Sequence, residues 1–245
     1  MGFQRRGGRG RRPDRPRPGE DAEADLPVSG TITAIKAQER NPERVSVFLD
    51  GAYAFAVTRE AALSAGLSIG RALSVDEVGG LRAGDVVSKG TEAALRLLAV
   101  RPRSEKELRD RLKQKAYDPE TIEAVLERVR GWGYLDDADF AQRWVANRIE
   151  HRPRGRRMLE QELRAKGIDR DTISETLEEA DLDETAAAIE LAEKSATRLR
   201  SLDPDVARRR LTGQLARRGF PYPAIKAAID HVLGERDDEE IAEDE

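Results

Sequence analysis

Residues 156–180 read RRMLEQELRAKGIDRDTISETLEEA, and this stretch decides the fold. Its regular apolar positions are separated by four, five, five and four residues, and they are Leu159, Leu163, Ile168, Ile173 and Leu177. A step of four keeps two side chains on one face of a helix, whereas a step of five crosses a turn. The stretch therefore predicts two short helices joined at Gly167, a residue suited to the left-handed turn that ends a helix.

The same pattern occurs in two other places. The first copy is set by Leu108, Leu112, Tyr117, Ile122 and Leu126, and the third by Leu211, Leu215, Phe220, Ile225 and Ile229. A helical unit that recurs with a period of roughly 50 residues is typical of a repeat protein. Such proteins present an extended surface to their partners, so we expect a chain that lies along something long.

Each pair of helices belongs to a larger predicted module. A third helix is expected at Asp136–Glu150 after the first pair and at Asp183–Arg200 after the second, whereas the third copy stops at Gly234. The predicted modules cover 91–152, 153–201 and, in truncated form, 202–234. The fold class is thus mainly α, with tandem three-helix repeats in an elongated array.

The region before the repeats is expected to form a small β subdomain over 28–90. Alternating residues predict strands at Thr31–Ile35, Val45–Leu49 and Ala52–Val57, and Asp50-Gly51 between the last two is a strong hairpin signal. Short helices are expected near Arg59–Ala65 and Val75–Ala83, because repeated glycines interrupt this part of the chain.

Both terminal segments have biased compositions. Residues 1–27 are rich in arginine and glycine, and 235–245 form an acidic tail, so both are expected to be disordered. The basic tail either binds phosphate backbones loosely or serves only as a solubilising extension. The acidic tail is either a regulatory segment or a solvated end, and we favour the solvated end.

Composition and motifs argue against several classes of protein. The 245 residues include no cysteine, and no apolar run reaches the roughly 18 residues of a membrane span. No secretory signal is visible, so a cytoplasmic location is expected. His151 and His231 lack ligand spacing, and no phosphate loop or nucleophile motif is present. We therefore expect no enzyme activity, no cofactor and no metal.

The richest local motif is Trp132-Gly133-Tyr134-Leu135-Asp136-Asp137-Ala138-Asp139-Phe140-Ala141. One interpretation is an aromatic platform for bases or a carboxylate cluster for a metal. We favour a structural interpretation, in which Asp136 caps the next helix, Asp137 favours its first turn, and Tyr134, Leu135 and Phe140 fasten two helices together.

These motifs together resemble the RecX family, the bacterial regulators of the RecA recombinase. The resemblance rests on Arg101-Pro102-Arg103-Ser104-Glu105-Lys106-Glu107-Leu108, Gly133-Tyr134-Leu135-Asp136-Asp137 with Phe140-Ala141, Glu162-Leu163 with Lys166-Gly167-Ile168, and Leu49-Asp50-Gly51 with Tyr53-Ala54-Phe55. It covers roughly 30–234. The chain departs from the family at Lys115-Ala116-Tyr117, where Lys-Gly-Tyr is usual, so this turn is expected to close differently.

The resemblance implies a function in recombination and the SOS response. RecX-like proteins bind the groove of the RecA filament on DNA and limit its extension, ATPase, strand-exchange and coprotease activities. It implies that the partner is the RecA filament. We expect a monomer, and the basic clusters or the N-terminal tail make single-stranded DNA a further candidate partner.

Basic residues cluster in all three copies. Acidic residues interleave with those of the first copy, which favours ordinary solvated helix faces there. Few acidic residues lie near the other clusters, which become the candidate partner-binding residues: Arg152, Arg154, Arg156, Arg157, Arg208, Arg209, Arg210, Arg217 and Arg218. The alternative function is direct DNA binding through tandem helix-turn-helix units.

Overall fold

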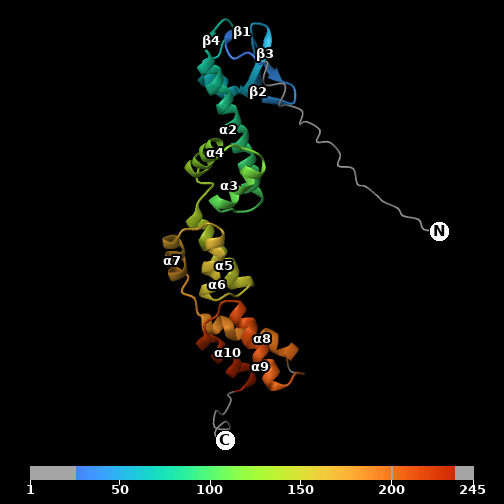
Figure 1. Ribbon diagram of the computed structural model, residues 1–245, viewed down its shortest axis with the longest axis vertical. Coiled ribbons are helices and arrows are strands. Elements are labelled where there is room, and N and C mark those ends of the chain that lie inside the picture. Colours follow the sequence, from blue (N-terminus) through green and yellow to red (C-terminus); the bar gives the residue numbers. More distant parts are fainter. Residues whose placement is uncertain (1–25, 200, 235–245) are drawn as a thin grey trace, which may run out of the picture. The chain divides into compact units, whose positions relative to one another are not determined.

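The computed structural model describes residues 26–199 and 201–234 and divides into two compact units (Figure 1). The boundary between the units lies between Ser88 and Lys89, within a long helix. The prediction of disorder at the chain termini falls on 1–27 and 235–245, almost wholly outside the described residues.

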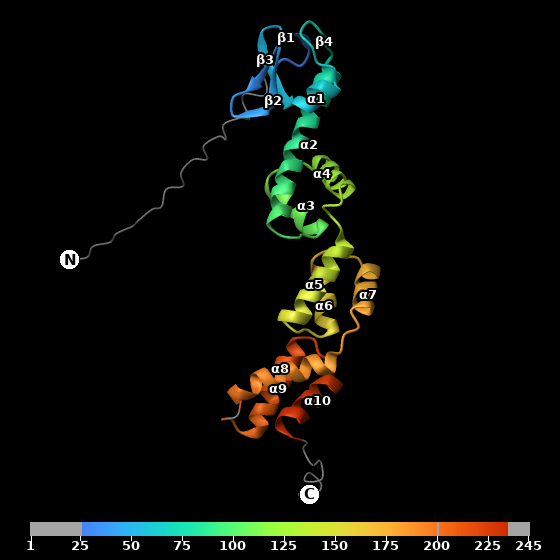
Figure 2. The ribbon, with the colours of Figure 1, turned by 180° about the vertical axis from the view of Figure 1, so that it is seen from behind.

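The first unit contains an antiparallel four-stranded sheet with the strand order β3-β2-β1-β4 (Figure 2). Its strands are β1 (Gly30–Gln38), β2 (Asn41–Leu49), β3 (Ala52–Thr58) and β4 (Ala72–Leu73). The predicted hairpin is confirmed: Asp50 and Gly51 turn between β2 and β3 with φ values of 47° and 88°. Both angles are positive, as a two-residue type I′ turn requires. The sequence did not predict β4, because its two residues are too few to show an alternating pattern.

The short helix after the sheet is confirmed as α1 (Arg59–Ser64). The prediction for the next helix was wrong, because α2 runs without a break from Val75 to Val100. Glycines cost roughly 0.5–1 kcal/mol each inside a helix, but tertiary contacts hold this one in place. Val78 is buried in the core of the sheet, and the Arg82 guanidinium donates to the carbonyl oxygen of Ala54 at 3.0 Å.

The second unit is helical. After α2 come α3 (Glu105–Gln114), α4 (Pro119–Gly131), α5 (Asp137–His151), α6 (Arg156–Ala165), α7 (Arg170–Glu179), α8 (Glu184–Leu199), α9 (Pro204–Arg217) and α10 (Tyr222–Leu233). The predicted helix pairs therefore correspond to α3–α4, α6–α7 and α9–α10.

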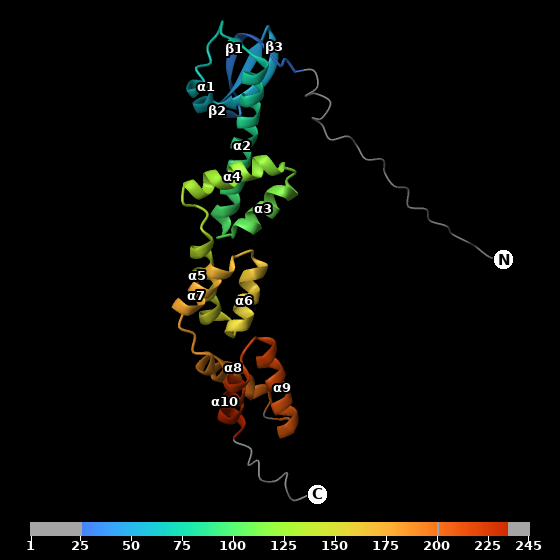
Figure 3. The same cartoon turned by 60° about the vertical axis from the view of Figure 1, so that its left-hand side comes forward.

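Packing groups these helices differently from the sequence analysis. The helix at 137–151 was assigned to the end of the first module, but Phe140 and Val145 of α5 share a core with α6 and α7. Likewise, Leu191 of α8 shares a core with α9 and α10, so the third group is complete rather than truncated (Figure 3). We call α2 from Lys89 onwards with α3 and α4 the first group, α5–α7 the second group and α8–α10 the third group.

The three helix pairs turn in the same way. The second residue after the first helix is left-handed in every pair, with φ values of 64° at Ala116, 87° at Gly167 and 85° at Gly219. In each turn the residue after the left-handed one donates its N–H to the carbonyl oxygen of the residue five positions earlier, as Tyr117 does to Leu112. The expectation that the turn at Ala116 closes differently was wrong, and alanine instead adopts a strained conformation there.

Candidate functional site

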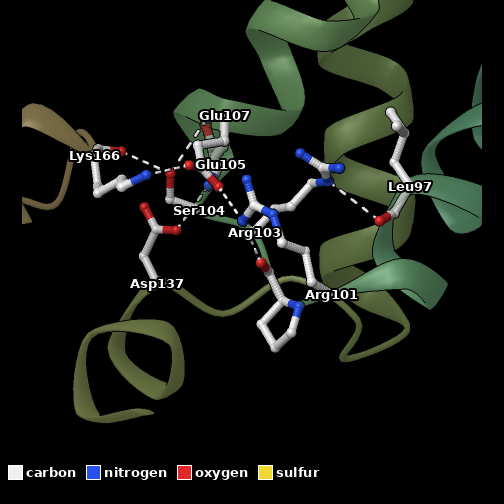
Figure 4. A network of polar contacts seen from close by, with 9 residues as sticks. Leu97, Arg101, Arg103, Ser104, Glu105, Glu107, Asp137 and Lys166 are labelled. Carbon is white, nitrogen blue, oxygen red and sulfur yellow. Dashed lines mark hydrogen bonds and ion pairs between the residues drawn. The ribbon is translucent and has the colours of Figure 1, made fainter. Parts of the chain in front are cut away.

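The contact between the first and second groups is built around Ser104, the N-cap of α3 (Figure 4). Its fully buried hydroxyl accepts from the Glu107 N–H at 3.2 Å and donates to the carbonyl oxygen of Lys166 at 2.7 Å. Lys166 is the C-cap of α6, and the next residue is Gly167. A Cβ atom at Gly167 would lie 2.6 Å from Cβ of Lys106. The start of α3 therefore sits directly on the C-terminal turn of α6.

Charged groups reinforce this contact. The ammonium of Lys166 forms an ion pair with Glu107, which also binds Arg101 at 2.8 Å. Burial would raise the pKa of Glu107, but the hydrogen bonds from Arg101 and Lys166 outweigh it, so the pKa is lowered. The ionised form of Glu107 is thus the form that joins the two groups at neutral pH.

Asp137 has a role that was not predicted from the sequence. Its carboxylate accepts the N–H of Glu105, the first residue of α3, at 2.8 Å. Burial raises the pKa of Asp137, and the neighbouring carboxylates of Glu105 and Asp136 act in the same direction. Asp137 lies on α5, so the second group supplies a cap for a helix of the first group.

The second and third groups meet in the same way. The N-cap of α6 is Gly155, and its N–H donates to the carbonyl oxygen of Arg218 at 2.9 Å. A Cβ at Gly155 would lie 2.2 Å from the carbonyl oxygen of Gly219, so only glycine fits here. Glu184 at the start of α8 accepts the N–H of Arg156 at 2.7 Å. Glu184 therefore caps α6 as Asp137 caps α3.

The aromatic motif divides into a buried part and an exposed part. Leu135 and Phe140 are 4% and 5% exposed, and Asp136 accepts the N–H groups of Ala138 and Asp139, as the structural interpretation predicts. The prediction for Tyr134 was wrong, because its side chain is 61% exposed. Gly133, with φ of 74°, turns the chain so that Leu135 enters the core while Tyr134 and Trp132 remain outside.

Two of the candidate arginines in 152–157 are used in the fold. Arg154 lies 3.4 Å from Glu162, and Arg156 lies 3.6 Å from Glu160 and donates to the carbonyl oxygen of Leu177. The expectation of few nearby acids was therefore wrong for this cluster. Arg152 and Arg157 remain exposed, and the described part of the chain places no acidic side chain within ion-pair distance of either.

The candidates in the third group divide in the same manner. Arg208 is only 20% exposed and pairs with Asp230 at 3.7 Å. Arg218 lies near Arg154; burial first and this like charge second lower the pKa of Arg218. By contrast, Arg209, Arg210 and Arg217 are exposed and line one shallow hollow on α9.

Five arginines thus remain available on the second and third groups: Arg152, Arg157, Arg209, Arg210 and Arg217. An exposed guanidinium without an internal partner can bind a carboxylate or a phosphate through its planar set of donors. Within 26–199 and 201–234, histidine and carboxylate side chains form no group of three that could hold a metal ion. No helix in the same ranges is long and apolar enough to cross a membrane.

Comparisons with known proteins match this architecture. Family models match the RecX N-terminal domain over 30–74 and the first, second and third RecX three-helix domains over 91–128, 136–177 and 182–229. The regulatory protein RecX of Bacillus subtilis is 37% identical over 85% of this chain and 79% of its own length. The chain belongs to the RecX family. Its second and third domains begin at α5 and α8, which agrees with the helix groups defined by the cores.

Other RecX proteins support the same assignment. The regulatory protein RecX of Clostridium botulinum strain Eklund 17B is 30% identical, and the match covers 82% of this chain and 96% of that protein. A crystal structure of regulatory protein RecX superposes with a TM-score of 0.70 at 26% identity, over 82% of this chain and 98% of the other. The structure of RecX from Lactobacillus salivarius gives 0.53 at 25% identity, over 60% and 97%.

Proposed function

We propose that this chain binds the RecA recombinase filament and restrains its extension, ATPase, strand-exchange and coprotease activities. Membership of a family of regulatory proteins supports a regulatory function. The observation that carries the proposal is the set of exposed arginines on the second and third groups. In the proposal the chain acts as a monomer in the cytoplasm, without a cofactor and without catalytic activity of its own.

The arginines favour an acidic or phosphate-bearing partner surface. Arg152 and Arg157 lie at the end of α5 and the start of α6, and the other three lie on α9. Because these two sites belong to different domains, a partner that repeats along its length could be held at both. Simultaneous attachment at two sites strengthens binding beyond that of either site alone.

The exposed aromatic pair gives a second proposed contact. Trp132 and Tyr134 are 54% and 61% exposed, on a turn held by hydrogen bonds from Gly133 and Tyr134 back into α4. Exposed tryptophan and tyrosine side chains on rigid turns lose little conformational entropy on binding, and they are enriched among the strongest contributors at protein interfaces. We therefore propose that this turn contacts the recombinase.

The test measures ATP hydrolysis by a recombinase filament on single-stranded DNA. Charge reversal of the five arginines should abolish inhibition by the chain. The control reverses three exposed cations at the end of α3 in the first group, Arg111, Lys113 and Lys115, and should inhibit like the parent. Circular dichroism checks that each variant is folded. Unchanged inhibition by the five-arginine variant would refute the proposed surface.

Direct DNA binding is the competing outcome. A pull-down on single-stranded DNA with and without recombinase separates the two functions. Retention of the chain that depends on the recombinase supports filament binding. Equal retention in its absence, lost in the arginine variant, would replace the proposal with DNA binding.

A further inference from the structure

One face of α9 forms a cationic hollow. Arg210, Gly213, Gln214 and Arg217 follow one another at helical spacing along this face, and Arg209 borders it. Gly213 forms the floor, because a Cβ there would lie 3.1 Å from Nη1 of Arg217. The glycine thus lets a guanidinium lie close to the helix backbone.

The hollow has an apolar wall, and none of the residues that line it is acidic. Leu199 from the end of α8 and Val206 from the first half of α9 form the wall. Among residues 26–199 and 201–234, no carboxylate pairs with Arg209, Arg210 or Arg217. Three positive charges beside apolar carbon suit an acidic peptide that also carries an aliphatic side chain.

Such a peptide follows directly in this chain. Residues 235–245 read ERDDEEIAEDE, which contains eight acidic residues, one arginine and one isoleucine, Ile241. The residue before this segment is fastened to α9: Nη2 of Arg208 donates to the carbonyl oxygen of Gly234 at 2.5 Å. The same guanidinium lies 3.7 Å from the Asp230 carboxylate on α10. The acidic segment therefore starts next to the helix that carries the hollow.

We propose that the acidic segment 235–245 binds the cationic hollow of α9 and covers it against other anions. Arg217 is nine residues beyond Arg208, which is about 14 Å along a helix. The segment must also pass around a helix roughly 10–12 Å wide, so the path is about 20 Å. Eleven extended residues reach up to about 36 Å, which is sufficient.

The covalent connection between the acidic segment and the third group strengthens its contact with the hollow, although that contact is exposed to water. A single exposed ion pair contributes little, but a short flexible connection gives an effective concentration in the millimolar range. Partners with weaker negative charge are then excluded from the hollow, whereas a dense array of carboxylates or phosphates displaces the segment. The contact lies within one molecule, and its test needs no recombinase. Failure of this proposal is therefore distinguishable from failure of the proposed function.

The experiment uses the full chain, which has no cysteine. A Glu240→Cys variant carries one nitroxide spin label, and NMR records the broadening of backbone amide signals. At about 0.01 M salt, where the Debye length is about 30 Å, the amides of α9 should broaden. At about 1 M salt, where it is about 3 Å, they should recover.

Two sets of substitutions sharpen the result. Reversal of Arg209, Arg210 and Arg217 to glutamate should remove the broadening at low salt. The control reversal of Arg111, Lys113 and Lys115 on the first group should leave it unchanged. Absence of broadening on α9 at low salt, or its persistence in the α9 variant or at high salt, would overturn the proposal.

A binding measurement tests the covering function. The probe is a short fluorescent single-stranded oligonucleotide, and the comparison variant has the eight acids of 235–245 changed to their amides. A segment that occupies the hollow nine-tenths of the time weakens a competing anion about tenfold, so the neutral segment should tighten binding about tenfold. The gain should vanish when the α9 arginines are also reversed. Unchanged affinity with the neutral segment, or a gain that survives the reversal, would also overturn the proposal.

Discussion

Ala116 stores strain that a single substitution should release. Its φ of 64° lies in the left-handed region, and its side chain is exposed. This conformation costs an L residue about 1–2 kcal/mol, whereas it costs glycine nothing. Glycine also destabilises the protein by about 0.5–1 kcal/mol, because it raises the conformational entropy of the unfolded chain. The expected net effect of Ala116→Gly is therefore a stabilisation of about 0.5–1 kcal/mol.

The assay is urea unfolding followed by circular dichroism. With a slope of about 1–3 kcal/mol per molar urea, the midpoint of Ala116→Gly should rise by roughly 0.2–1 M. Ala116→Asn should fall between the parent and the glycine variant, because asparagine tolerates the left-handed region better than alanine.

The matched control is the opposite change in the third copy of the turn. Gly219 has φ of 85°, and a Cβ there would lie 2.6 Å from the backbone nitrogen of Met158. Gly219→Ala should therefore cost more than the left-handed penalty alone. If Ala116→Gly leaves the midpoint unchanged or lowers it while Gly219→Ala destabilises as expected, then the turn at Ala116 is not strained and the reasoning fails.

Three further predictions concern the start of α5 and the ion pairs of Glu107 on α3. Asp136→Ala should cost about 0.5–2 kcal/mol in thermal or urea unfolding through loss of the helix cap; a parent-like curve would show that the cap contributes nothing. Phe140→Ala should cost about 3–5 kcal/mol, whereas Tyr134→Ala should leave stability unchanged and weaken recombinase binding; the reverse pattern would refute the assignment of buried and exposed rings. Because the pKa of Glu107 is lowered from its ordinary value of 4.5, its stabilising contribution is present above that pH and is lost as the pH falls through the folded-state pKa. The difference in unfolding free energy between the parent and Glu107→Gln should thus be larger at pH 7 than at pH 3; a pH-independent difference would contradict this.

The sequence predicted the structure best where a signal depends only on residues that are close together in the chain. The apolar steps of four and five located three helix pairs, and Asp50-Gly51 located the hairpin, because these signals depend on local geometry. The grouping of α5 and α8 was not predicted, because a helix between two pairs can pack on either pair while the apolar pattern of the pairs stays the same. Similarly, the glycines of α2 are overridden by its contacts with the sheet.

The candidate arginines show the same limit. Arg156 faces Glu160 at the i,i+4 spacing of a helix, a signal that the sequence does contain. The pairing of Arg208 with Asp230 joins two helices, so it depends on packing that the sequence alone does not reveal. Only the packed structure separates the arginines that hold the fold from those that remain available to a partner.

The contact between neighbouring groups occurs twice, and it accounts for sequence differences between equivalent helix ends. The first N–H of α3 is capped by Asp137 of the second group, and that of α6 by Glu184 of the third group. The equivalent position of α9 is Pro204, which has no N–H and needs no carboxylate from a further group. At the other end, the C-terminal turns of α6 and α9 carry a neighbouring helix start that leaves no room for a Cβ. In the equivalent turn of α3, Ala116 is exposed, so its Cβ is tolerated at the cost of backbone strain.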